Sequence, residues 1–127
     1  MTPSSPERRP DPIDESVLEA LSQLHPEHRA DIAKNLVLMF LETSPLVLQH
    51  LEEAAARNDA GALRRESHIL VSSSAAVGAR LLSSACKDLE EAALMGTVSD
   101  TVARVRAITR LYGEAQSTLR AWCSGRG

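Results

Sequence analysis

Apolar residues recur every three or four positions along four long stretches of this chain, which is the spacing of one face of an α-helix. In residues 58–77 this stripe consists of Leu63, Ser67, Leu70, Ser74 and Val77. The chain holds one Phe, one Tyr and one Trp, whereas Ala and Leu dominate. Strands prefer aromatic and β-branched residues, so the composition and the spacing together predict an all-α protein.

Proline and capping residues divide the chain into a tail, a short helix and longer helical segments. Residues 1–12 hold four of the six prolines and no apolar period, so they are predicted to be a disordered or flexible tail. Asp14 is predicted to cap a short helix that ends before Pro26, because the residue before a proline avoids the helical region. In the next segment, Pro45 predicts a kink or a short break near Ser44.

The remaining boundaries follow from asparagine, aspartate and glycine. Asn58 and Asp59 are expected to end the second segment and to cap the third. Gly78 is expected to end the third segment in a left-handed conformation, and Gly96 is expected to end the fourth. Ser99 or Asp100 is expected to cap the last segment. The residues expected to face inward are Val17, Leu18, Leu21, Leu24, Ile32, Leu36, Met39, Phe40, Val47, Leu48, Leu51, Leu82, Ala85, Cys86, Leu89, Ala93, Val102, Val105, Ile108, Tyr112, Ala115, Leu119 and, at the end of the last stripe, Trp122. Short turns make antiparallel neighbours, so residues 13–123 predict an antiparallel up-and-down four-helix bundle with a short additional N-terminal helix.

Length, charge and cysteine content limit the class of protein further. The 127 residues suffice for one domain, and a net charge of −3 argues against nucleic-acid binding through a basic surface. No apolar run reaches the length of a signal core or membrane span, and two cysteines are too few for a disulfide framework. These features predict a cytoplasmic, monomeric domain that binds neither membrane nor nucleic acid.

Most chemical signatures are missing from the sequence. His25 and His28 straddle a proline with no third ligand spaced to join them, so no metal site is expected. Cys86 lies on an inward stripe, where a thiol usually behaves as a small hydrophobe. Residues 72–74, three serines, lack the glycines of a nucleophile elbow, and no glycine-rich loop is present to cradle the phosphates of ATP. No cofactor is therefore expected.

His68 lies on the wrong side of its own helix for a core residue. At roughly 100° per residue it falls about 140° from the centre of the apolar stripe, so it is predicted to face solvent. Arg64 lies one turn before it, Arg65 is adjacent to Arg64, and the small residue Ser72 lies one turn after it. An exposed imidazole with an open approach and nearby cations is suited to accepting a charged group, although a lone exposed histidine is more often an ordinary solvated residue.

The segment LRRESHILVSSSAAVGA, residues 63–79, resembles the signature of histidine-containing phosphotransfer (HPt) domains. The shared pattern is a histidine, a leucine two residues later, a small residue at the fourth position and a Gly-Ala pair at the turn. The similarity continues in Leu82, Cys86, Leu89 and Glu90, extends back through Phe40, Leu41, Pro45, Leu48 and Leu51, and covers roughly residues 13–95. The resemblance implies a four-helix bundle with accessory helices.

The resemblance also implies a function in two-component signal transduction. His68 would accept a phosphoryl group from the aspartate of a receiver domain and pass it to another receiver, without kinase activity of its own. The partners would be a response-regulator receiver domain or a hybrid sensor kinase, and Mg²⁺ would be held by the receiver only. Arg64, Arg65 and Ser72 would support the histidine. The initiating Met1 and the proline-rich start favour a free-standing protein over a piece of a hybrid kinase.

One position departs from the family pattern and leaves two alternatives open. The family usually has lysine three residues after the histidine, where this chain has Val71. The chain could therefore be a phosphotransfer-deficient adaptor that only binds a receiver or kinase domain. A helical interaction module unrelated to a relay is a second alternative, and it predicts that the outer face tolerates a bulky change such as Ser72→Phe. Ile69 and Val71 lie off the core stripe and are candidates for an apolar docking patch.

Overall fold

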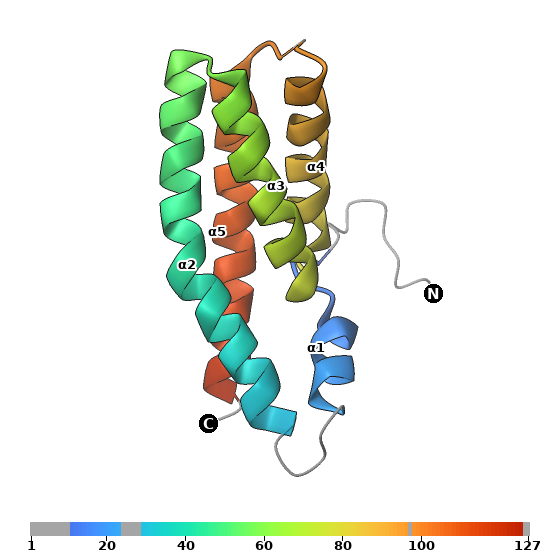
Figure 1. Ribbon diagram of the computed structural model, residues 1–127. Coiled ribbons are helices and arrows are strands. Elements are labelled where there is room, and N and C mark those ends of the chain that lie inside the picture. The colour runs from blue at the N-terminus through green and yellow to red at the C-terminus, as the bar shows by residue number, and fades with distance from the viewer. Residues whose placement is uncertain (1–10, 24–28, 97, 126–127) are drawn as a thin grey trace, which may run out of the picture.

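Every regular element in the part of the chain described by the computed structural model, residues 11–23, 29–96 and 98–125, is a helix. The helices are α1 (Glu15–Ser22), α2 (Arg29–Arg57), α3 (Ala60–Ala76), α4 (Arg80–Leu94) and α5 (Thr101–Gly125). Each of the four long helices packs against the next, α5 returns to α2, and α1 packs on α2 (Figure 1). The predicted all-α, up-and-down four-helix bundle with a short N-terminal helix is confirmed.

Capping residues begin α1 and α3 as the sequence predicts. Asp14 Oδ1 accepts a hydrogen bond from Ser16 N at 3.1 Å at the start of α1, and Asp59 Oδ1 accepts one from Ala62 N at 3.1 Å at the start of α3. Asn58 ends α2 with a φ of 53°, in the left-handed region that Asn tolerates. Helix α1 ends at Ser22 with Gln23 as its C-cap, before Pro26 as predicted. Residues 1–10 of the predicted tail at residues 1–12, and the inward position of Leu24, fall outside the described residues.

Pro45 does not break α2, which runs as one helix from Arg29 to Arg57. The ribbon bends along its length instead (Figure 1). Two hydroxyls just before the proline donate back to carbonyls four residues earlier, Thr43 to Met39 at 2.9 Å and Ser44 to Phe40. Hydroxyl bonds of this kind accompany bending of a helix. The sequence therefore predicted the disturbance correctly, and the structure shows that it is a bend and not a break.

The core confirms most of the inward-facing residues but corrects two of them. Met39 is 59 % exposed and Val102 is 44 % exposed. The buried positions nearby are Val37, two residues before Met39, and Thr101, one residue before Val102. At the start of α5 the prediction chose Val102 over the less apolar Thr101, whereas one residue along a helix turns a side chain by about 100°. The buried residues of α5 accordingly run Thr101, Val105, Ile108, Tyr112, Ala115, Leu119 and Cys123, at spacings of three and four.

The turn between α3 and α4 fixes α1 to the bundle. Gly78 has a φ of 83°, as predicted for a residue that ends a helix in the left-handed region. Its carbonyl accepts a hydrogen bond from Asp14 N at 2.7 Å, and Asp14 Oδ2 lies 2.9 Å from Arg80 Nη2. A Cβ at Gly78 would lie 2.5 Å from the Asp14 carbonyl oxygen, so only glycine allows this approach. No helix in the described residues is long and apolar enough to cross a membrane.

Candidate functional site

Helix α3 has one face in the core and one face in solvent. Leu63, Ser67, Leu70, Ser74 and Val77, the stripe expected from the sequence, are all buried. His68 points away from that stripe, and its side chain is 67 % exposed. The packing of the stripe holds the backbone of α3 in place, so His68 is displayed on a rigid surface and not on a loop. The predicted exposure of His68 is confirmed.

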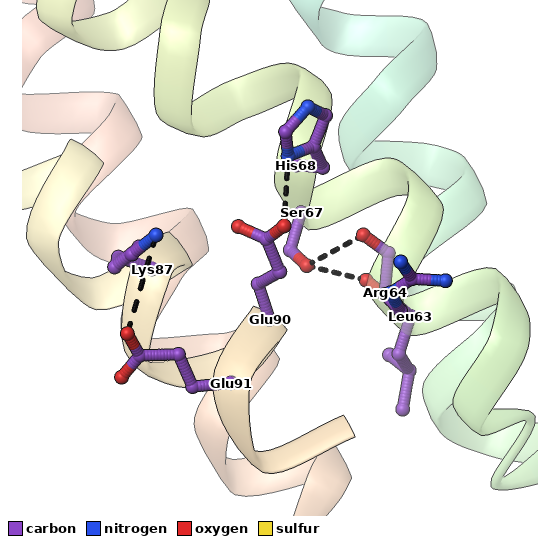
Figure 2. Close-up of polar contacts among 7 residues, drawn as sticks. All are labelled: Leu63, Arg64, Ser67, His68, Lys87, Glu90 and Glu91. Carbon is purple, nitrogen blue, oxygen red and sulfur yellow. Dashed lines mark hydrogen bonds and ion pairs between the residues drawn. The ribbon is translucent and has the colours of Figure 1, made fainter. Parts of the chain in front are cut away.

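Two serines lie in the buried stripe, and the helix itself supplies hydrogen bonds to the first. The Ser67 hydroxyl contacts the carbonyl oxygens of Leu63 at 2.5 Å and Arg64 at 3.2 Å (Figure 2). A buried hydroxyl without a partner would destabilise the fold, so this bonding explains how a serine fits directly beneath His68. A small side chain at this position also lets α3 lie close to its neighbours.

The His68 ring is held in place by Glu90 of the neighbouring helix α4. The His68 Nδ1 atom lies 2.7 Å from Glu90 Oε2, and the Glu90 side chain is only 16 % exposed (Figure 2). A carboxylate only accepts hydrogen bonds, so Nδ1 carries the proton and donates it to Glu90. The other ring nitrogen, Nε2, lies at the far end of the ring from Glu90 in Figure 2. The pair therefore fixes both the ring orientation and the tautomer, and it leaves the lone pair of Nε2 available.

The cations predicted to support His68 share a surface hollow with it. This hollow, of about 390 Å³, is lined by Arg64, Arg65, His68, Ile69 and Glu90. Both arginines are exposed. Positive charge and the available nitrogen of His68 thus meet at one open surface, as an anionic group would require. Ile69 adds a 48 % exposed apolar side chain to the rim.

Ser72 and Val71, which were also predicted near the site, do not line the hollow around His68. Ser72 is exposed on the turn after His68 and does not line the hollow. Val71 is half-buried and packs against the core. The expectation that Val71 lies off the core is therefore wrong in part, since the packing of α4 on α3 covers positions at the edge of the buried stripe.

Glu90 is the residue of the site whose role the sequence analysis missed. Glu90 appears there only as part of the family resemblance. A positional signal was also present, since His68 and Glu90 lie at equal distances along the chain from Ala79, in the turn between α3 and α4. Two antiparallel helices joined by a short turn bring such positions together. The register of that packing decides whether their side chains meet, and the helical period alone does not fix it.

The remaining candidate side chains stay apart from this site. Burial raises the pKa of the Cys86 thiol to about 12, and burial also raises the pKa of Cys123. Neither thiol is therefore a ready nucleophile. His50 of α2 lies with its Nδ1 3.4 Å from Glu66 Oε1 of α3. His25 and His28 fall outside the described residues, and no group of three or more metal-ligating side chains occurs among the residues that the structure describes.

A helical bundle that presents a histidine, oriented by a carboxylate and flanked by arginines, is the architecture of a phosphotransfer domain. The family model of the Hpt domain matches residues 35–118, well over half of the chain. The chain therefore belongs to the Hpt domain family, the phosphotransfer proteins of two-component phosphorelays.

A solved structure extends this comparison to nearly the whole chain. It is the crystal structure of histidine-containing phosphotransfer protein B (HptB) from Pseudomonas aeruginosa PAO1, with a TM-score of 0.79 and 26 % sequence identity. The alignment covers 95 % of this chain and 97 % of HptB. A search of curated proteins found no match.

Proposed function

We propose that His68 is the phosphoacceptor of this domain, which takes a phosphoryl group from the aspartate of one receiver domain and passes it to another. The observation that supports the proposal most directly is the His68–Glu90 pair. It holds Nδ1 at 2.7 Å from Glu90 Oε2 while the ring stays 67 % exposed. Such an arrangement presents one nucleophilic nitrogen, Nε2, to a visiting protein.

The transfer follows from this geometry. The lone pair of Nε2 attacks the phosphorus of an aspartyl phosphate, an N–P bond forms, and the bond between phosphorus and the aspartate oxygen breaks. The aspartate leaves as a carboxylate. Because Nδ1 keeps its proton, the phosphorylated ring is an imidazolium, and the Glu90 carboxylate stabilises that positive charge. In the onward step a second receiver's aspartate attacks phosphorus, and the imidazole leaves as a neutral group.

The two arginines and the partner supply the remaining charge stabilisation. Arg64 and Arg65 line the same hollow as His68 and are placed to offset the negative charge of the phosphoryl group. Mg²⁺ belongs to the acidic pocket of the receiver domain, as phosphoryl transfer generally requires a cation on the phosphoryl oxygens. The domain is then a phosphoryl carrier without kinase activity of its own. The partner is a receiver domain, alone or within a hybrid kinase.

The direct test mixes the protein with a phosphorylated receiver domain and follows the label. We expect acid-labile, base-stable label on the wild-type protein and none on His68→Gln. The matched control is His50→Gln, which removes another helical histidine paired with a glutamate and should leave labelling unchanged. NMR of the labelled protein should place phosphorus on Nε2. Label that persists in His68→Gln, or that sits on Nδ1, contradicts the proposal.

The same experiment separates transfer from binding alone. A phosphotransfer-deficient adaptor, the alternative raised by Val71, would bind the receiver and remain unlabelled. An unrelated interaction module would do neither. Incubation with ATP and Mg²⁺ alone should leave the protein unlabelled, because the domain depends on its partner for the phosphoryl donor.

The exposed face around His68 is proposed as the docking surface for the receiver. Ser72 lies on the turn after His68 and is exposed. A phenylalanine there has room on the free protein but stands where the receiver must approach. Ser72→Phe should therefore abolish receiver binding while the helical circular dichroism and the unfolding midpoint stay unchanged. Receiver binding that survives this change contradicts the proposed docking surface, whereas wild-type protein that does not bind the receiver favours the unrelated interaction module.

A further inference from the structure

The charge around His68 is unevenly distributed. A phosphoryl group adds about two negative charges at neutral pH. Arg64 and Arg65 lie toward the start of α3 from His68, whereas the next turn in the other direction offers Val71 and Ser72, which carry no charge. The acidic side chain of Glu90 is already in contact with the ring. A phosphoryl group on Nε2 therefore has cations from α3 on one side only.

The edge of α4 that faces α3 offers a cation on the other side. Ser83, Lys87 and Glu90 are spaced by four and three residues, so they lie on one face of α4. The first and last of them both reach α3. Ser83 Oγ donates to the Val71 carbonyl at 2.8 Å, and Glu90 Oε2 accepts from His68 Nδ1 at 2.7 Å. Lys87 lies between these two contacts, along the same edge.

Lys87 is available to move. Its side chain is 55 % exposed, and its Nζ lies 4.0 Å from Oε2 of Glu91, which is itself 62 % exposed (Figure 2). An exposed pair at that distance is weak. The other cation of α4, Arg80, is engaged with Asp14 at 2.9 Å. A lysine ammonium on a four-carbon stem can turn from one partner to another at little cost.

We propose that Lys87 is a catalytic residue that supplies the second cation of the transfer site. Its ammonium turns from Glu91 toward the phosphoryl group on His68 as that group arrives, and returns to Glu91 when the group leaves. The positive charge absent from α3 on this side of the histidine is thus provided by α4. This inference rests on the proposed role of His68.

The test compares maximal transfer rates from a phosphorylated receiver at saturating concentration. Lys87→Gln should lower the rate about fivefold, the effect of one exposed charge close to the phosphoryl group in a high-dielectric surface. Lys87→Arg, which keeps the charge, should stay within about twofold of the wild type. The matched control is Arg110→Gln on α5, which changes the net charge equally on an exposed residue of another helix.

Substitution of Glu91 should change the transfer rate in the opposite direction from substitution of Lys87. Glu91→Gln frees Lys87 from its resting partner and should raise the rate, whereas Glu91→Gln combined with Lys87→Gln should behave like Lys87→Gln alone. A purely structural role for Lys87 predicts no such gain. The effect of Lys87→Gln should also shrink at high salt, since exposed charges are screened.

These measurements distinguish a failure of the proposed function of His68 from a failure of the proposed role of Lys87. Wild-type protein that takes no label refutes the proposed function itself. Wild-type protein that is labelled, with Lys87→Gln at the same rate or Arg110→Gln equally slow, refutes only the role of Lys87. A change confined to the receiver concentration at half-maximal rate makes Lys87 a docking residue and likewise overturns the inference.

Discussion

The substitution Gly78→Ala tests how the turn between α3 and α4 is held. Gly78 has a φ of 83°, and an alanine forced into the left-handed region costs about 1–2 kcal/mol. Its Cβ would also lie 2.5 Å from the Asp14 carbonyl oxygen, which is backbone and must move. Loss of the hydrogen bond from Asp14 N to the Gly78 carbonyl adds about 1 kcal/mol. The reduced freedom of the unfolded chain returns about 0.4–1 kcal/mol.

The net expectation is a loss of about 2 kcal/mol in the free energy of unfolding. Urea unfolding followed by circular dichroism should show the midpoint lowered by about 1 M, given the usual slopes for small domains. Gly113→Ala is the matched control, since Gly113 lies within α5 and a Cβ there meets nothing within 4 Å. That variant should be more stable by up to about 1 kcal/mol. Equal shifts for the two variants, or an unchanged midpoint for Gly78→Ala, refute the reasoning.

Two further predictions concern the two faces of α3 and the buried thiol. Leu70→Ala, at a fully buried residue, should cost about 2–5 kcal/mol in urea unfolding, whereas Ile69→Ala, one residue along and 48 % exposed, should cost less than about 0.5 kcal/mol and weaken receiver binding instead. Similar losses of stability would show that α3 is packed differently. Because burial raises the pKa of Cys86 to about 12, the native thiol should resist alkylation at pH 8 and react only on unfolding. The unfolded thiol ionises first, so the stability contributed by the protonated thiol is complete below about pH 8.5 and declines as the pH rises toward 12. Urea unfolding at pH 7 and pH 10 checks this sign against Cys86→Ala, which should show a smaller decline.

The sequence by itself determined the helices and the exposure of His68 on the outer face of α3. Spacings of three and four fix which residues of α3 turn inward, because the helical period is a local property of the backbone. The same period places His68 outside, and capping by Asp14 and Asp59 depends on residues within three positions of each other. These features need no knowledge of what lies across the bundle.

Only the tertiary structure decided what His68 meets. Its partnership with Glu90 joins residues 22 positions apart and depends on the register between α3 and α4, which the packing of whole helix faces sets. The same packing partly buried Val71. It also assigned inward positions to Val37 and Thr101, because the helical period does not distinguish candidates one or two residues apart when each of them suits a helix. Local periodicity therefore presents the histidine, and long-range packing determines its chemistry.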